Sequence, residues 1–349
     1  MQLTTGDADQ WAWVQIGEPF PENPVRVKGE MNQYIALWYK NGKPVMGRAW
    51  SNNGVVECSF PYSGRELTGA RDLGGQIQIL TYKGDFAKNK FYYEWVQWKD
   101  RNQDHLALVR CGQATNILMK VKSGNNLVGN MDLTTETATV AENGKGESVA
   151  GGANATNLVI VRNHYKPAVM KGVTLRHPQP DQWKDIRIHD PTPETGSLVM
   201  AGGKKIDTGD GRLVEHFVAL WYKNGEPVFG RAWTYKGNTV EASFGMLGKE
   251  FTGAIGSIQT LSYYPDQVAS HGFTINWVPY KDCVGGGKEW KPVQVKDVAP
   301  CIIKNNKGHE KLGCCWMLQG KASCGWSGLE EVYTGACVQD YLILCRKDA

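Results

Sequence analysis

The sequence lacks long apolar runs. Stretches such as Leu158–Val161 and Tyr341–Cys345 are typical of its longest, and they fall far short of the roughly 20 residues of a membrane-spanning helix. The first ten residues, Met1–Gln10, have neither the basic start nor the apolar core of a secretory signal. We therefore expect a cytosolic protein that inserts into no membrane.

Neither half of the chain has an excess of one charge. The whole sequence carries 39 Lys and Arg against 35 Asp and Glu, a formal net charge of +4. Residues 1–165 and 181–349 are each close to neutral, and most of the surplus comes from the basic residues between them. A nucleic-acid-binding surface normally needs a strongly basic face. Nucleic acid is therefore not an expected partner.

Motifs that mark a reaction class are absent as well. No phosphate-binding G-x-x-x-x-G-K-[ST], metalloprotease H-E-x-x-H or nucleophile-elbow G-x-S-x-G occurs. Glu57 and Glu66 recur in the second half as Glu241 and Glu250. We interpret them as solvated positions beside strands rather than as an acid–base pair. The sequence predicts no catalytic residue and no enzyme.

The cysteines do not have the spacing of a metal site. There are nine, and seven of them lie within residues 283–349. No C-x-x-C pair occurs, and the adjacency of Cys314 and Cys315 suits few tetrahedral zinc sites. In a reducing cytosol, thiols usually behave as small buried apolar side chains. We expect neither a metal nor a cofactor.

What the sequence does contain is a long internal repeat. Residues 35–54 and 218–237 are identical at fourteen of twenty positions, and weaker matches extend the repeat over about 9–162 and 181–346. The repeat predicts a first domain over 1–165, a linker over 166–180 with three prolines, and a second domain over 181–349. Residues 195–215 are an insertion in the second copy, expected to form a surface loop or hairpin.

Each copy is rich in strand and turn signals. Thirteen Trp, fourteen Tyr and 41 Gly favour pleated sheets joined by tight turns. Asn41-Gly42 and Asn224-Gly225 predict type I′ hairpin turns. Gly47 and Gly230 predict a bulge or a close backbone approach in the return strand.

Further strands are expected over 76–82, 91–98, 116–121 and 158–161, with short helical turns near 265–270 and 329–333. No long amphipathic helix is evident. The predicted fold class is therefore mainly β with a few short helices, arranged as two tandem homologous β-sheet-rich domains.

The repeated hairpin is also the candidate protein-binding site. Arg, Trp and Tyr dominate the energetics of protein interfaces, and the hairpins gather Trp38, Tyr39, Arg48, Trp50, Trp221, Tyr222, Arg231 and Trp233. The alternative is that these aromatic residues pack the core while Asn-Gly only makes the turn. The Thr-rich segment 132–139 is either an exposed strand or a phosphorylation segment.

The duplicated motif Leu-Trp-Tyr-Lys-Asn-Gly-[Lys/Glu]-Pro-Val-x-Gly-Arg-Ala-Trp resembles that of the nematode MSP fibre proteins. These are cytosolic accessory proteins of sperm that crawl on a cytoskeleton of major sperm protein. The resemblance implies a protein of the sperm pseudopod that promotes assembly of major sperm protein filaments into fibres. It implies as partners those filaments or other sperm fibre proteins. It specifies no site residues.

A second resemblance implies an alternative function. Asn224–Ala232 is similar to an element of the DM-nine repeat proteins, some of which are mannose-binding lectins, and it implies a carbohydrate-binding module. The duplication itself leads to a further hypothesis. Two weak sites on one chain gain from high effective concentration and could bridge two subunits or two filaments. The sequence specifies no oligomeric state.

Overall fold

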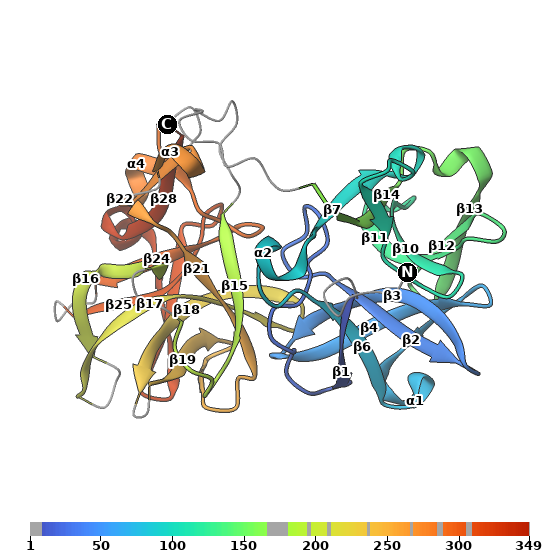
Figure 1. Ribbon diagram of the computed structural model, residues 1–349. Helices are drawn as coiled ribbons and strands as arrows, with labels where there is room; N and C mark the ends of the chain where they lie inside the picture. The colour runs from blue at the N-terminus through green and yellow to red at the C-terminus, as the bar shows by residue number, and fades with distance from the viewer. Residues whose placement is uncertain are drawn as a thin grey trace. The chain divides into compact units, whose positions relative to one another are not determined.

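The structure is a computed structural model. It describes residues 9–165, 181–193, 197–207, 211–235, 238–265, 268–284, 289–304 and 309–348. Contacts divide the chain into two units, Met1–Val169 and Met170–Ala349; their described parts are called the first and second domain below. Each domain is built on one antiparallel sheet of fourteen strands (Figure 1). The expected linker, 166–180, lies outside the described residues.

The first domain is almost entirely strand, with short helical turns between strands. Its elements are β1 (Gln10–Gln15), β2 (Tyr34–Lys40), β3 (Lys43–Asn52), β4 (Val55–Tyr62), β5 (Arg65–Thr68), α1 (Gly69–Leu73), β6 (Gln76–Thr81), α2 (Phe86–Asn89), β7 (Tyr92–Gln97), the 3₁₀ helix η1 (Trp98–Asp100), β8 (Leu106–Leu108), β9 (Arg110–Cys111), β10 (Ala114–Lys120), β11 (Asn126–Asp132), β12 (Thr137–Glu142), β13 (Lys145–Ala150), η2 (Gly151–Asn154) and β14 (Leu158–Asn163).

The second domain repeats this strand order, except that the insertion adds the long strand β16 and no described strand corresponds to β9. Its elements are β15 (Gln182–Arg187), β16 (Met200–Asp207), β17 (Leu213–Lys223), β18 (Glu226–Tyr235), β19 (Thr239–Met246), β20 (Lys249–Thr252), β21 (Ser257–Ser262), α3 (Val268–His271), β22 (Phe273–Pro279), α4 (Tyr280–Cys283), β23 (Lys291–Pro292), β24 (Val298–Lys304), β25 (Glu310–Trp316), β26 (Lys321–Trp326), β27 (Leu329–Thr334), η5 (Gly335–Asp340) and β28 (Leu342–Asp348).

Each domain is itself made of two similar halves. In the first domain the strand order is β1-β6-β2-β3-β4-β5 in one half and β7-β14-β10-β11-β12-β13 in the other, joined at β5 and β13. In both halves a short helical turn precedes the last strand: β5 is followed by α1 and β6, and β13 is followed by η2 and β14. The second domain has the same two-half order. The repeat seen in the sequence is therefore a pair of domains that are each internally duplicated.

One glycine marks the same place in all four halves. A β-carbon on Gly47 would overlap the carbonyl oxygen of Ser59 and the ring of Phe60 on the neighbouring strand. Gly230 meets Ser243 and Phe244 in the same way, and the second halves have Gly129 and Gly313 against their own neighbours. The register runs unbroken through Ala36↔Gly47. Of the two expectations for Gly47 and Gly230, close backbone approach is therefore confirmed, and no bulge occurs at Gly47.

The two halves of a domain pack face to face. β3 contacts β10 and β11, and β4 contacts β12, although none of these pairs are neighbours in the sheet; the Met46 amide of β3 donates to Asn130 Oδ1 of β11 at 2.9 Å. In Figure 1 the blue strands β2, β3 and β4 form one layer and the green strands β10, β11 and β12 another. Side chains on both faces of β2 are consequently buried: Ala36 and Trp38 belong to one apolar cluster, and Leu37 belongs to a second.

The mainly β fold and the four additional strands are confirmed, and one of the two expected helical turns is wrong. β6, β7, β10 and β14 lie where strands were expected, and α3 overlaps the helical turn expected near 265–270. The helical turn near 329–333 was wrong, because Leu329–Thr334 is strand β27, paired with β26 through the Ser327-Gly328 turn. The insertion contributes β16, which pairs with β17 as a hairpin.

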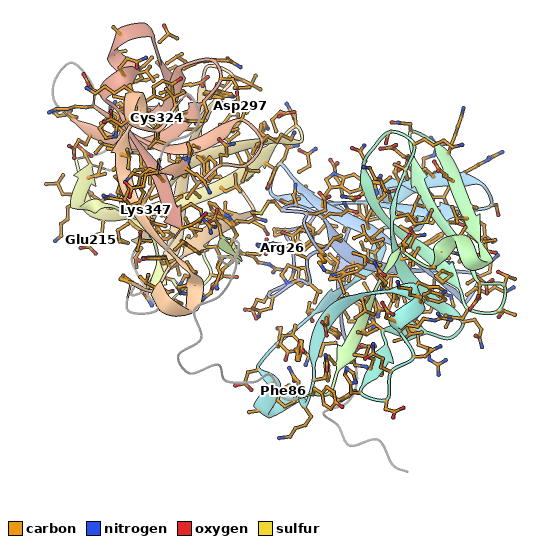
Figure 2. All side chains as sticks on the ribbon, turned by 90° about the horizontal axis from the view of Figure 1, so that it is seen from above. Arg26, Phe86, Glu215, Asp297, Cys324 and Lys347 are labelled. Atoms are coloured by element: carbon orange, nitrogen blue, oxygen red, sulfur yellow. The ribbon has the colours of Figure 1, made fainter. Side chains whose placement is uncertain are left out.

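Seven of the nine cysteines are buried, as expected for small apolar side chains. Five of them belong to one core cluster of the second domain: Cys283, Cys301, Cys315, Cys324 and Cys345. Figure 2 shows Cys324 inside the strands of that domain. Burial raises the pKa of the Cys324 thiol to about 12, so this thiol is protonated and a poor nucleophile.

Candidate protein-binding surface

The two repeated hairpins have the predicted turns. Asn41 and Gly42 have φ angles of 50° and 74°, and Asn224 and Gly225 have 54° and 78°. Positive φ at both central residues is the property of a type I′ turn. The strands on either side pair directly, as Lys40↔Lys43 shows for the first hairpin.

The structure buries five of the eight candidate side chains. Trp38 is 6% exposed, and the whole second-domain set lies between 1% and 5%: Trp221, Tyr222, Arg231 and Trp233. Among the eight, accessible surface remains on Tyr39, which is 39% exposed, and on the half-buried Arg48 and Trp50. The core-packing alternative therefore describes the five buried residues. A binding role for the hairpins stays a prediction, with Tyr39 as its most exposed residue.

Arg48 organises a polar network in the first domain. Its Nη2 donates to Glu66 Oε1 at 3.3 Å and to the carbonyl oxygen of Ala141 at 3.1 Å. The same Glu66 accepts from Ser59 Oγ at 2.6 Å and from the Gly144 amide at 2.8 Å. Since Ala141 and Gly144 belong to the other half of the domain, this network ties the two halves together.

The same network recurs in the second domain at greater depth. Arg231 Nη2 donates to Glu250 Oε1 at 3.2 Å, and Glu250 accepts from Ser243 and from the Gly328 amide at 2.8 Å. The side chain of Arg231 is 1% exposed, against 16% for Arg48. Desolvation lowers the pKa of Arg231, opposed by the charge of Glu250, and an arginine nevertheless stays charged.

These contacts correct one sequence interpretation. Glu66 and Glu250 were expected at solvated positions, but their side chains are 10% and 9% exposed and are held by an arginine, a hydroxyl and a backbone amide. Glu57 and Glu241 accept the indole N–H of the tryptophan on the adjacent strand at 2.9 and 3.1 Å. All four carboxylates therefore stabilise the sheet through hydrogen bonds to other strands.

A feature that sequence reasoning missed lies where the two halves of the second domain meet. Leu247 and Leu329 are each 64% exposed. Leu329 pairs with Lys249 across the junction, and the Leu247-Gly248 turn is tied to the neighbouring strand by the Gly248 amide, which donates to Glu330 at 2.8 Å. We call Leu247 and Leu329 the apolar tip.

The first domain has no apolar tip. Ser63 occupies the turn position that corresponds to Leu247, and Lys145 occupies the paired position that corresponds to Leu329. The signal was present in the sequence as a leucine directly before a turn glycine. Leu247 adopts a φ of +54°, a conformation that leucine rarely takes.

A family model described as a cytosolic motility protein, MFP2b, matches residues 8–164 and 180–348. The chain belongs to this family. A solved structure described as the nematode sperm cell motility protein MFP2B is 39% identical, with 98% of each chain covered and a TM-score of 0.91. No curated protein matches the chain.

Membership of the MFP2b family confirms the resemblance to nematode sperm fibre proteins and the tandem β-domain fold. The family description also confirms the expected cytosolic location. Among the helices that the structure describes, none is long and apolar enough to cross a membrane.

Proposed function

We propose that this protein is a non-enzymatic accessory protein that promotes assembly of major sperm protein filaments into fibres. The observation that carries the proposal is the 39% identity, over 98% of the chain, to a nematode sperm cell motility protein. The proposed partners are major sperm protein filaments or other sperm fibre proteins. In support of a non-enzymatic role, the repeated carboxylates Glu66 and Glu250 are bound to arginine, serine and backbone amides in both domains.

The apolar tip is the proposed contact of the second domain. Two exposed leucines at the junction of the two halves resemble the apolar centre of a protein interface. A left-handed conformation costs a leucine roughly 1–2 kcal/mol, and Leu247 adopts it without burying its side chain. A contact with a filament subunit would offset that cost by covering both side chains.

The first domain would bind through its hairpin. Tyr39 is exposed at the end of β2, where its hydroxyl contacts Cys111 Sγ at 3.0 Å. A tyrosine held in this way presents a large rigid surface at a small entropic cost. Two different contacts on one chain would then act together, each raising the effective concentration of the other.

The test is fibre growth from purified major sperm protein with and without the purified full-length chain. The proposal expects the chain to co-sediment with fibres and to increase their growth rate. Replacing the tip with its first-domain counterparts, Leu247→Ser with Leu329→Lys, should remove most of the increase. The control is Leu318→Ser, since Leu318 is 89% exposed in the same domain but lies outside the tip.

A wild-type chain that neither co-sediments with fibres nor alters their growth would overturn the proposed function. Equal losses in the tip variant and in the Leu318 control would instead leave the function standing and remove the tip from it. Circular dichroism of each variant would confirm that the chain is folded.

A further inference from the structure

Three arginines line one hollow on the surface of the first domain. The hollow has a volume of about 460 Å³, and its wall includes Arg101, Arg110 and Arg162. Arg101 follows η1, Arg110 lies in β9 and Arg162 lies in β14, so the fold brings them together from separate parts of the chain. The acidic residue of the lining is Asp104, and two further acids outside the lining, Glu136 and Asp9, pair with Arg101 and Arg162.

Arg101 is held in a defined position. Its guanidinium stacks 3.7 Å from the ring centre of Trp98. It also donates to the Trp98 carbonyl oxygen at 2.6 Å and to Glu136 at 2.9 Å. These bonds use two of the five N–H donors of a guanidinium. An arginine fixed in this way loses little side-chain entropy when it binds a further acceptor.

Arg162 and Arg110 complete the cluster in different ways. Arg162 lies 3.7 Å from Asp9 and is 20% exposed, so its charge is partly balanced. Arg110 is exposed on the two-residue strand β9. Within the residues that the structure describes, no acidic side chain lies within 4 Å of its charged group. Arg110 is therefore the arginine of the hollow whose positive charge has no acidic partner among the described residues, whereas Arg101 and Arg162 are paired with Glu136 and Asp9.

The second domain does not reproduce the cluster. Trp98-Lys99-Asp100-Arg101 corresponds to Tyr280-Lys281-Asp282-Cys283, so a buried cysteine replaces Arg101. Arg346 stands in the place of Arg162, and it pairs with Asp181 at 3.0 Å as Arg162 pairs with the equivalent Asp9, so this ion pair is common to both domains. Neighbouring lysines there are matched by acids, as Lys291 is by Asp348 at 2.8 Å. The first domain alone carries the three-arginine arrangement among the described residues.

We propose that this hollow binds the phosphate group of a small soluble organic phosphate. Guanidinium groups match phosphate oxygens through paired N–H donors, and the bonds are charge-assisted. A phosphate monoester carries close to two negative charges at neutral pH, so it interacts with the unpaired Arg110 and with the unused N–H donors of Arg101 more strongly than a singly charged carboxylate does. The volume lies within the usual 300–1,000 Å³ of small-ligand sites, and Asn102 and Gln103 offer amide groups to the rest of the molecule.

The test is isothermal titration of the full-length chain with sodium pyrophosphate and with glycerol 3-phosphate at constant ionic strength. Saturable binding of one ligand per chain is expected. Arg110→Ala should weaken it by about tenfold, the usual effect of losing one charged hydrogen-bonding partner. The matched control is Arg65→Ala, an exposed arginine of the same domain outside the hollow, which should leave the affinity unchanged.

A second arm separates a soluble ligand from a lipid headgroup. The chain is sedimented with phosphatidylcholine vesicles that contain a phosphoinositide. Binding to these vesicles without binding of the two soluble phosphates would overturn the proposal. Absence of saturable binding in both arms, or equal weakening by Arg65→Ala and Arg110→Ala, would also overturn it.

Discussion

Removing Arg231 should destabilise the second domain more than removing Arg48 destabilises the first. Both arginines make the same ion pair, at 3.2 Å to Glu250 and at 3.3 Å to Glu66. Their exposure differs, at 1% for Arg231 and 16% for Arg48. Breaking a fully buried pair costs about 3–5 kcal/mol because the remaining charge has no partner. A partly hydrated pair costs about 1–3 kcal/mol.

The cost at Arg231 has three sources that the structure identifies. Arg231→Met leaves Glu250 charged and held only by Ser243 and the Gly328 amide. It removes the bond from Arg231 to the Asp207 carbonyl oxygen at 3.0 Å. It also removes the packing of the guanidinium between two tryptophan rings, at 5.7 and 5.1 Å. Adding Glu250→Gln should recover part of the loss, because the unpaired charge is then gone.

Urea unfolding of the full chain measures the difference, and hydrogen exchange localises it to one domain. A loss near 4 kcal/mol lowers the urea midpoint of a domain of this size by about 2 M, since its slope is about 2 kcal/mol per M. The reasoning is refuted if Arg48→Met costs as much as Arg231→Met, or if adding Glu250→Gln deepens the loss.

Three further predictions follow from burial. Gly230→Ala should cost about 1–3 kcal/mol in urea unfolding, because its β-carbon meets backbone and a ring that cannot move aside, whereas Gly152→Ala, with open space around it, should be nearly neutral. Burial lowers the pKa of His216 from 6.5 to about 3. Below pH 6.5, His216 therefore binds a proton in the unfolded chain but not in the folded chain. The free energy of unfolding falls by about 1.4 kcal/mol per pH unit as the pH drops toward 3. His216→Phe should remove this pH dependence from the urea midpoints. In native protein, iodoacetamide should label Cys337 first, then the half-buried Cys111, and the seven buried thiols only after denaturation, as mass spectrometry would show.

Patterns confined to a few neighbouring residues predicted the structure well. Asn41-Gly42 makes the expected turn because the positive φ angles it needs are a local property of asparagine and glycine. Close approach at Gly47 was foreseeable for a similar reason, since a glycine within a strand offers no side chain to neighbouring backbone. The same local reasoning failed at residues 329–333, where pairing with β26 decides the conformation.

The candidate site was harder to predict because exposure is a tertiary property. Trp221 and Trp38 look like interface residues in the sequence, yet each is buried in the apolar core cluster of its own half-domain. Burial of β2 on both faces could be derived only once the internal duplication of each domain was known, and the sequence similarity between halves is too weak to show it. Glu250 was misjudged for the same reason, since its partner amide at Gly328 is 78 residues away.

The four half-domains provide an internal comparison that bears on function. Features that recur, such as the buried glycine and the Arg–Glu pair, serve the fold and recur at equivalent places. Features that do not recur are not required by the shared fold: the apolar tip belongs to the second domain, and the three-arginine hollow belongs to the first. Two equivalent filament-binding sites on one chain would not account for these differences between the domains. Under the proposed function the two domains would make different contacts, so Ser63→Leu with Lys145→Leu in the first domain should not restore the increase in fibre growth rate to a chain that carries Leu247→Ser and Leu329→Lys.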